Sequence, residues 1–362
     1  MKYSANISAV MAFLVSVGVL IFVKSAAVES KPAECREQME NSYKLAEKWL
    51  GIASEKKAKK GIKNKINGVK YSELLGEEYN STTTTLGSLE AKEISLNPDF
   101  ASLACRWMIE CGIDSTSTIG ICASSSFPAL VISTLAAAQT LKTKVVLFTS
   151  FGASMFGAND TAATWVDIEN WLADSGGLKY KSAVITYGGN DDNGEGMPDE
   201  GKKIMDKAAQ RNNVMIYKPA ALNESINMKM DILKKNRIKL FVNIGGNETA
   251  LGNCSHSAGI PNGLQKKIPI CSHSERGLII RTAETGVPII NLLNIKALAA
   301  KYGISEPAVN SHYKNEGIYL VQKINIAVVA AGITALLLFF VFIYRPAIIR
   351  TRNLQGFDCL RR

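Results

Sequence analysis

One uncharged apolar segment near the carboxyl end constrains this chain more than any other feature. Residues 324–344 hold 21 residues without a charged side chain. A helix of that length, rising about 1.5 Å per residue, spans a hydrocarbon core of ~30 Å. Several arginines follow in residues 345–362, and basic residues beside a span stay on the cytoplasmic side. We therefore expect a transmembrane helix at 324–344 and a basic cytoplasmic tail at 345–362.

A second apolar run lies at the amino terminus, in residues 1–23. Its apolar part, Ile7–Val23, is closed by Lys24. It is interpreted either as an uncleaved membrane anchor or as a secretory signal peptide, and its length favours the anchor. The predicted location is the cytoplasmic membrane, with two spans, both termini in the cytoplasm and the central domain outside.

Charge restricts the class of partner. The net charge of the 362 residues is +10. About half of that excess lies in the terminal segments, so the central segment is only mildly basic. Such a surface weakly favours acidic partners. Nucleic acid is excluded as a partner because the domain is expected outside the cytoplasm and carries no nucleic-acid-binding motif.

Residues 24–117 predict a helical, membrane-proximal region. Residues 35–50 carry apolar side chains at helical spacing, and 100–111 form a second helix after the start signal Asn97-Pro98-Asp99. Seven lysines in 56–70 form either a solvated helix face or a contact strip for lipid headgroups or an acidic polymer. The polar, threonine-rich segment 77–99 is expected to be an ordered loop entering a helix.

Residues 118–323 alternate short apolar runs with longer helical patterns. The predicted strands are 118–122, 144–149, 182–187, 214–217, 238–244 and 287–292, and the predicted helices are 128–141, 165–172, 202–210, 221–235 and 295–302. This alternation is typical of an α/β fold with a mostly parallel, doubly wound sheet covered by helices on both faces.

The loops that follow the predicted strands share a composition rich in Gly, Ser and Asn. Loops at the carboxyl ends of parallel strands converge on one edge, where ligands bind. Ser124, Ser125 and Ser126 precede Pro128, the first-turn residue of a helix whose free N–H groups would face an anion. The candidate residues for binding a polymer or another anion are Ser124, Ser125, Ser126, Gly152, Ser154, Asn159, Asn190, Gly245, Gly246 and Asn247.

Catalytic candidates come from the same loops. A triad would combine one of Ser124, Ser125, Ser126 or Ser154 with His256 or His273 and an acid. The run 152–156 is similar to a nucleophile elbow, but Phe156 stands where the second glycine belongs. The sequence leaves open whether the protein is an enzyme.

The tetrapeptide Cys-Ser-His-Ser occurs twice, at 254–257 and 271–274. Cys254, His256, Cys271 and His273 could form a zinc site, although their spacing is unusual. Alternatively, Cys254 and Cys271 form a disulfide or remain free thiols. No metal site is therefore firmly predicted, and no cofactor is expected.

An ordered set of segments carries a family resemblance. These are 77–100 with its Thr-Thr-Thr-Thr-Leu-Gly-Ser-Leu-Glu-Ala-Lys core, 125–130, 152–159, 164–169 and 242–247. Together they resemble the bacterial poly-gamma-glutamate system protein, a membrane component that accompanies the poly-gamma-glutamate ligase and its small membrane partner. The likeness runs from about Tyr71 to Tyr302. It implies a part in making or exporting a gamma-linked polyglutamate capsule, and it brings no catalytic residues.

Three functions follow as hypotheses. The first is a membrane-anchored accessory of poly-gamma-glutamate biosynthesis and export that binds or guides the anionic polymer, with the ligase and the small membrane components as partners. The alternative is a Ser/His amidase or transferase that trims or anchors the polymer. A tethered receptor for a small molecule is the third.

Overall fold

The computed structural model describes residues 2–61, 66–253, 259–268, 276–309 and 315–358. The chain divides into two compact units. One is Glu34–Tyr319, and the other combines Met1–Ala33 with Leu320–Arg362. The segments 62–65, 254–258, 269–275 and 310–314 lie outside the described residues, and with them lie the two Cys-Ser-His-Ser repeats.

The unit made from the two ends of the chain has two helices and a two-stranded sheet. Helix α1 (Lys2–Ala26) leads into β1 (Val28–Pro32), and β10 (Leu320–Ile324) leads into α12 (Ile326–Asp358). The strands pair antiparallel, with Val28 opposite Ile324. A Cβ built on Gly332 of α12 would lie 2.3 Å from the Val23 side chain of α1, so the glycine permits a close approach of the two helices.

The prediction of transmembrane helices at 1–23 and 324–344 is wrong. Across the part of the chain that the structure describes, no helix combines the length and the apolar character that crossing a membrane requires. The apolar run at 324–344 is not an element of its own, because it begins in β10 and shares α12 with the arginines that follow. The two-span location in the cytoplasmic membrane, with the central domain outside and both termini inside, depended on these spans and is wrong with them.

The larger unit is built on a six-stranded sheet with the order β6-β4-β3-β7-β9-β8. Its members are β3 (Thr118–Ser124), β4 (Lys144–Ser150), β6 (Ser182–Thr186), β7 (Leu240–Ile244), β8 (Gly263–Gln265) and β9 (Ile289–Leu292). All pairs are parallel except that of β8 with β9, so the sheet is mixed. The central strand β3 is buried on both faces, as its unbroken run of apolar and small residues predicts.

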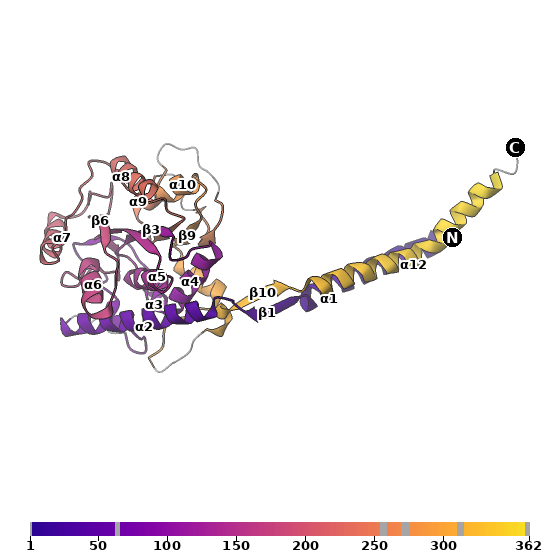
Figure 1. Ribbon diagram of the computed structural model, residues 1–362, viewed down its shortest axis with the longest axis horizontal. Helices are drawn as coiled ribbons and strands as arrows, with labels where there is room; N and C mark the ends of the chain where they lie inside the picture. Colours follow the sequence, from indigo (N-terminus) through magenta and orange to yellow (C-terminus); the bar gives the residue numbers. More distant parts are fainter. Residues whose placement is uncertain (1, 62–65, 254–258, 269–275, 310–314, 359–362) are drawn as a thin grey trace. The chain divides into compact units, whose positions relative to one another are not determined.

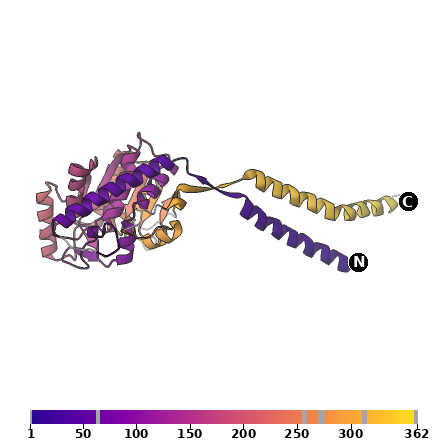
Figure 2. The same ribbon diagram turned by 90° about the horizontal axis from the view of Figure 1, so that it is seen from below.

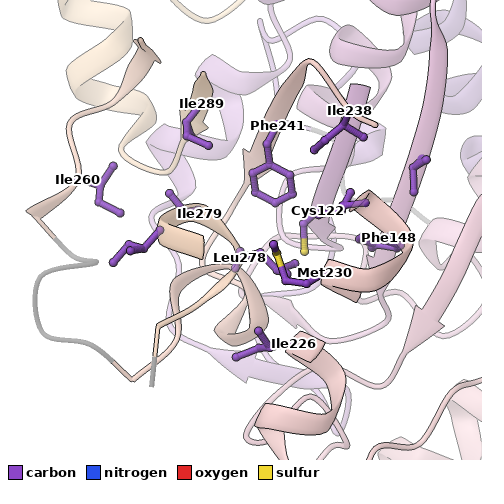
Figure 3. Packing of buried hydrophobic residues seen from close by; sticks show 14 of the residues in the cluster. Cys122, Phe148, Ile226, Met230, Ile238, Phe241, Ile260, Leu278, Ile279 and Ile289 are labelled. Carbon is purple, nitrogen blue, oxygen red and sulfur yellow. The ribbon is translucent and has the colours of Figure 1, made fainter. Parts of the chain in front are cut away.

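One face of the sheet packs against α8 (Leu222–Lys235), α9 (Glu248–Leu251) and α10 (Leu278–Ala283). Figure 3 shows the core between them, in which Phe241 and Cys122 of the sheet meet Met230 and Leu278 of the helices. Close contact depends on Gly120 of β3, because a Cβ there would lie 2.5 Å from the Leu233 side chain. Burial of this apolar surface is the main source of stability on this face.

Helix α5 (Pro128–Thr140), the crossover from β3 to β4, is apolar nearly all round and is buried accordingly. Two helices that precede the sheet in the sequence pack against α5. They are α2 (Arg36–Lys59) and α4 (Asp99–Glu110). Figure 2 shows α2 as the long indigo helix along one side of this unit. The region predicted as membrane-proximal thus contributes helices to the same compact unit as the sheet.

The prediction of an α/β fold is confirmed. The remaining helices of the larger unit are α3 (Leu89–Ser95), α6 (Trp165–Trp171), α7 (Asp199–Arg211) and α11 (Ile295–Tyr302) (Figure 1). The predicted strand 214–217 is absent from the sheet, since only Tyr217 forms a bridge, with Thr186. Strands β1, β8 and β10 were not predicted. Neither were the short strands β2 (Thr83–Thr85) and β5 (Ala153–Ser154), which pair parallel with each other.

Candidate functional site

A cleft of about 630 Å³ lies at the carboxyl ends of the parallel strands. The loops that follow five of the strands line the cleft. The threonine-rich segment and the start of α3 complete its wall. The lining residues on which the argument depends are Gly87, Lys92, Ser124, Ser126, Phe127, Ser150, Ser154, Gly246, Asn247, Glu248 and Lys296. This is the edge at which the strand–helix pattern predicts a ligand site.

Seven of the ten candidate binding residues line this cleft: Ser124, Ser126, Gly152, Ser154, Asn190, Gly246 and Asn247. The other three have structural roles beside it. Ser125 Oγ donates to the Ser150 carbonyl at 2.6 Å, and Asn159 Nδ2 donates to Thr83 Oγ1 at 2.9 Å. Gly245 turns the chain with a φ of +83°.

The serine loop after β4 is held by the threonine-rich segment. Strand β2 pairs with β5, so that Thr85 is the Cα partner of Ser154. Thr84 Oγ1 also donates to the Ala153 carbonyl at 3.2 Å, and Met155 N donates to the Thr85 carbonyl at 3.0 Å. Two segments about seventy residues apart in the sequence therefore define one wall of the cleft.

Lys92 of α3 reaches Ser154 across this wall. Its Nζ donates to Ser154 Oγ at 2.7 Å and to the Ser126 carbonyl, and it lies 3.7 Å from the centre of the Phe127 ring. The residue is only 1% exposed. Burial lowers the pKa of the Lys92 ammonium to about 7, because the charged form loses its hydration. A substantial fraction of Lys92 is therefore neutral near pH 7.

Two other lysines are buried to the same degree, and both form ion pairs. Lys57 pairs with Asp160, and Lys229 pairs with Asp192 at 2.6 Å. The described residues give Lys92 no carboxylate partner; they give it a hydroxyl, a carbonyl and an aromatic ring. A buried lysine without a counter-ion is rare in structural cores and common where a lysine acts as a base.

The backbone around Ser154 is tightly positioned. Ser154 N donates to Ser126 Oγ at 2.9 Å. A Cβ on Gly157 would lie 2.8 Å from the Ser125 carbonyl, so the glycine lets the two loops touch. Phe156 adopts a φ of +60°, which is the left-handed backbone conformation. In a nucleophile elbow this position is occupied by a glycine. The turn forms although its residue is not glycine.

Ser124 is the cleft residue that lies at the end of β3. Its Oγ is buried and forms no hydrogen bond within the described part of the chain. It faces Gly245, where a Cβ would lie 2.5 Å away. Helix α5 starts nearby at Pro128 without a side-chain cap at Phe127, and its Leu130 and Val131 N–H groups donate to the Phe127 carbonyl, at 3.0 and 3.2 Å.

The opposite side of the cleft carries Asn247 and Glu248. Asn247 Nδ2 donates to Ser150 Oγ at 3.2 Å, and its Oδ1 accepts from Thr249 N at 2.9 Å. Glu248 accepts a hydrogen bond from Asp191 N at 2.6 Å. Burial is the main cause that raises the pKa of the Glu248 carboxyl, and the neighbouring Asp191 and Asp192 carboxylates raise it further.

Of the catalytic candidates, Ser126 and Ser154 line the cleft, and Ser125 lies behind it. His256, His273, Cys254 and Cys271 lie outside the described residues. Across the described segments, no group of three or more His, Cys, Asp or Glu residues is arranged to hold a metal ion.

The sequence interpretation missed Lys92. A signal was present, because Lys92 occurs with Ala91, Ile94 and Ser95 on the buried side of α3. A lysine on the apolar face of a short helix is unusual.

No protein-family model, no curated protein and no solved structure matches this chain.

Proposed function

We propose that this protein binds an anionic, carboxylate-bearing chain in the cleft and acts as an accessory of poly-gamma-glutamate formation. The observation that carries the proposal is the composition of the cleft. Backbone and side-chain hydrogen-bond donors from five strand-end loops meet there with two lysines, Lys92 and Lys296. Carboxylates are bound in proteins by such combinations of N–H, hydroxyl and ammonium groups.

The size of the cleft supports a short stretch of chain as the ligand. Its volume of about 630 Å³ falls within the range of ligand sites, ~300–1,000 Å³. A stretch of a few residues would fill it, while the rest of a long polymer would remain in solvent. The poly-gamma-glutamate ligase and its small companion proteins are the proposed partners, as the family resemblance implies.

Lys296 is the cleft residue best suited to exchange partners. It bridges Glu90 at 3.1 Å, with half of its own side chain and most of the Glu90 side chain in solvent. Exposed ion pairs contribute little to stability, typically ~0–1 kcal/mol. A ligand carboxylate can therefore replace Glu90 at small cost.

Binding of fluorescently labelled poly-gamma-glutamate oligomers to the full-length protein tests the proposal. We expect saturable binding that weakens as salt rises. Lys296→Ala should weaken it several-fold, whereas Lys301→Ala, on the exposed side of the same helix and outside the cleft, should not. An uncharged polyglutamine oligomer should not compete.

Absence of binding at low salt would overturn the proposal. Equal effects of Lys296→Ala and Lys301→Ala would also overturn it, because the polymer would then be held by the general surface charge rather than by the cleft.

A further inference from the structure

We propose that Ser154 and Lys92 form a catalytic pair, in which Ser154 Oγ is the nucleophile and Lys92 Nζ the general base for acyl transfer from an amide bond. The pair differs from the Ser/His arrangement predicted from the sequence. The assignment of the nucleophile and its base rests on the geometry and burial of these two residues and does not depend on the proposed function. The choice of substrate, an amide of the carboxylate-bearing chain, rests on the proposed function.

The distance between the two groups satisfies the first requirement of such a pair. Lys92 Nζ and Ser154 Oγ are 2.7 Å apart, within the range for direct proton transfer. Both side chains line the cleft, although each is largely buried. The pair is therefore placed at a ligand site and shielded from bulk water.

Space for a substrate is kept open in front of the hydroxyl. A Cβ built on Gly87 would lie 3.2 Å from Ser154 Oγ and 2.6 Å from the Met155 carbonyl. Any side chain at position 87 would occupy the volume next to the nucleophile. Gly87 thus allows the backbone to pass close to Ser154 without covering it.

The second requirement is a base that can accept a proton, and the protonation state of Lys92 satisfies it. A lysine accepts a proton only when it is neutral, and burial brings the Lys92 pKa to about 7. Burial lowers the Lys57 pKa as well, but there the Asp160 carboxylate opposes the shift, whereas the described residues give Lys92 no carboxylate partner. The hydrogen bond from Ser154 is available to neutral Lys92, because its nitrogen then carries a free electron pair.

The reaction balances without a further reagent except water. Ser154 Oγ attacks the amide carbonyl carbon as its proton passes to Lys92 Nζ. The C–N bond then breaks, and Lys92 returns the proton to the leaving nitrogen, which gives a free amine and an ester on Ser154. Water attacks the ester and gives a proton to Lys92. The ester C–O bond breaks, and that proton returns to Ser154 Oγ, which releases a carboxylic acid.

A fluorophosphonate probe tests the nucleophile independently of any polymer. The serine oxygen displaces fluoride from phosphorus, which adds a fixed mass to the protein. We expect one adduct per full-length chain, located on Ser154 by peptide mapping. Labelling should be absent in Ser154→Ala and unchanged in Ser115→Ala, which alters an exposed serine before β3. Lys92→Met should slow it at least about hundredfold.

The pH profile of the wild-type protein provides a second measurement that does not depend on the folding of a variant. The labelling rate should rise about tenfold per pH unit below the Lys92 pKa and level off above it, with a midpoint near 7. Circular dichroism establishes that each variant is folded.

The outcomes separate this inference from the proposed function. Folded wild-type protein without an adduct, an adduct on another serine, or a labelling rate independent of pH between 5 and 9 would overturn the catalytic pair. Labelling of Ser154 with shortening of poly-gamma-glutamate supports both proposals. Labelling without binding or shortening of the polymer supports the pair and overturns the polymer as its ligand and substrate.

Discussion

Thr85 and Ser154 are Cα partners in the parallel pairing of β2 with β5, although they lie far apart in the sequence. The pairing brings the threonine-rich segment to the serine loop after β4. Four residues after Thr85, the chain enters α3, whose buried face carries Lys92. The same stretch of chain therefore closes the cleft and delivers the lysine that contacts Ser154.

The buried ion pair of Lys57 with Asp160 predicts a large loss of stability on removal of one partner. Lys57 also donates to the Leu74 and Leu75 carbonyls, at 3.2 and 3.0 Å. Asp160→Asn would leave a buried ammonium group without its counter-charge. We expect the free energy of unfolding to fall by about 3–5 kcal/mol in urea titrations.

The exposed pair of Lys59 with Glu55 on the same helix is the matched control. Glu55→Gln should change the free energy of unfolding by no more than ~0.5 kcal/mol. If Asp160→Asn and Glu55→Gln had equal effects, the buried pair would not stabilise the fold.

Gly246 lines the cleft and Gly245 precedes it in the chain, but the two differ in what a side chain would meet. Gly245 has a φ of +83°, and a Cβ there would lie 2.5 Å from Ser124 Oγ. At Gly246 the nearest atom to such a Cβ is 3.8 Å away, an ordinary contact. Gly245→Ala should lower the free energy of unfolding by at least about 1–2 kcal/mol and weaken polymer binding.

Gly246→Ala should leave the free energy of unfolding within ~0.5 kcal/mol of the wild type. Thermal and urea unfolding of both variants measure the contrast. Equal stability of the two variants would mean that the turn after β7 relaxes without strain.

The fold was more predictable than the site, and the reasons are physical. Helix α11 was predicted with its observed bounds, because Asn294 caps it and its apolar residues recur at helical spacing. Strand β8 was missed since three residues at an antiparallel edge carry no periodic signal. The transmembrane prediction failed because a long apolar run does not by itself define where an element begins and ends.

The site residues were predicted in part. Polar loop residues after buried strands indicated the edge of the sheet, and seven of the ten candidates line the cleft. The pairing of β2 with β5 could not be predicted, since a two-residue strand forms only when its partner is already positioned. Lys92 was missed because composition treats lysine as a surface residue, whereas its burial follows from tertiary packing.

The Lys92 pKa also predicts how stability depends on pH. In the unfolded chain the ordinary lysine value of 10.5 applies, whereas in the folded protein the pKa is about 7. Between these values the unfolded state binds one more proton, so raising the pH favours the folded state by about 1.4 kcal/mol per unit. This gain ends above pH 10.5 and is absent below pH 7.

The difference in unfolding free energy between wild type and Lys92→Met isolates this contribution, because other groups titrate in both proteins. We expect the unfolding free energy of the wild type to increase relative to that of the variant as the pH rises from 7 to 9. A difference that stays constant over that range would show that Lys92 keeps its proton when folded.

Polymer binding and serine reactivity should respond to pH in opposite directions. As the pH falls from 8 to 6, Lys92 gains a positive charge. The carboxylates of poly-gamma-glutamate stay ionised over this range. The change makes the cleft more positive, so we expect the polymer to bind several-fold more tightly at pH 6, an effect of about 1 kcal/mol.

Fluorophosphonate labelling should be fastest at pH 8, because only neutral Lys92 accepts the proton of Ser154. Fluorescence anisotropy and intact-mass measurements on one preparation give both profiles. In Lys92→Met the pH dependence of binding should shrink, since the lysine that gains charge in the cleft is removed. If binding and labelling both increased toward pH 8, the ammonium form of Lys92 would not attract the polymer, and the proposed use of one lysine for both roles would be wrong.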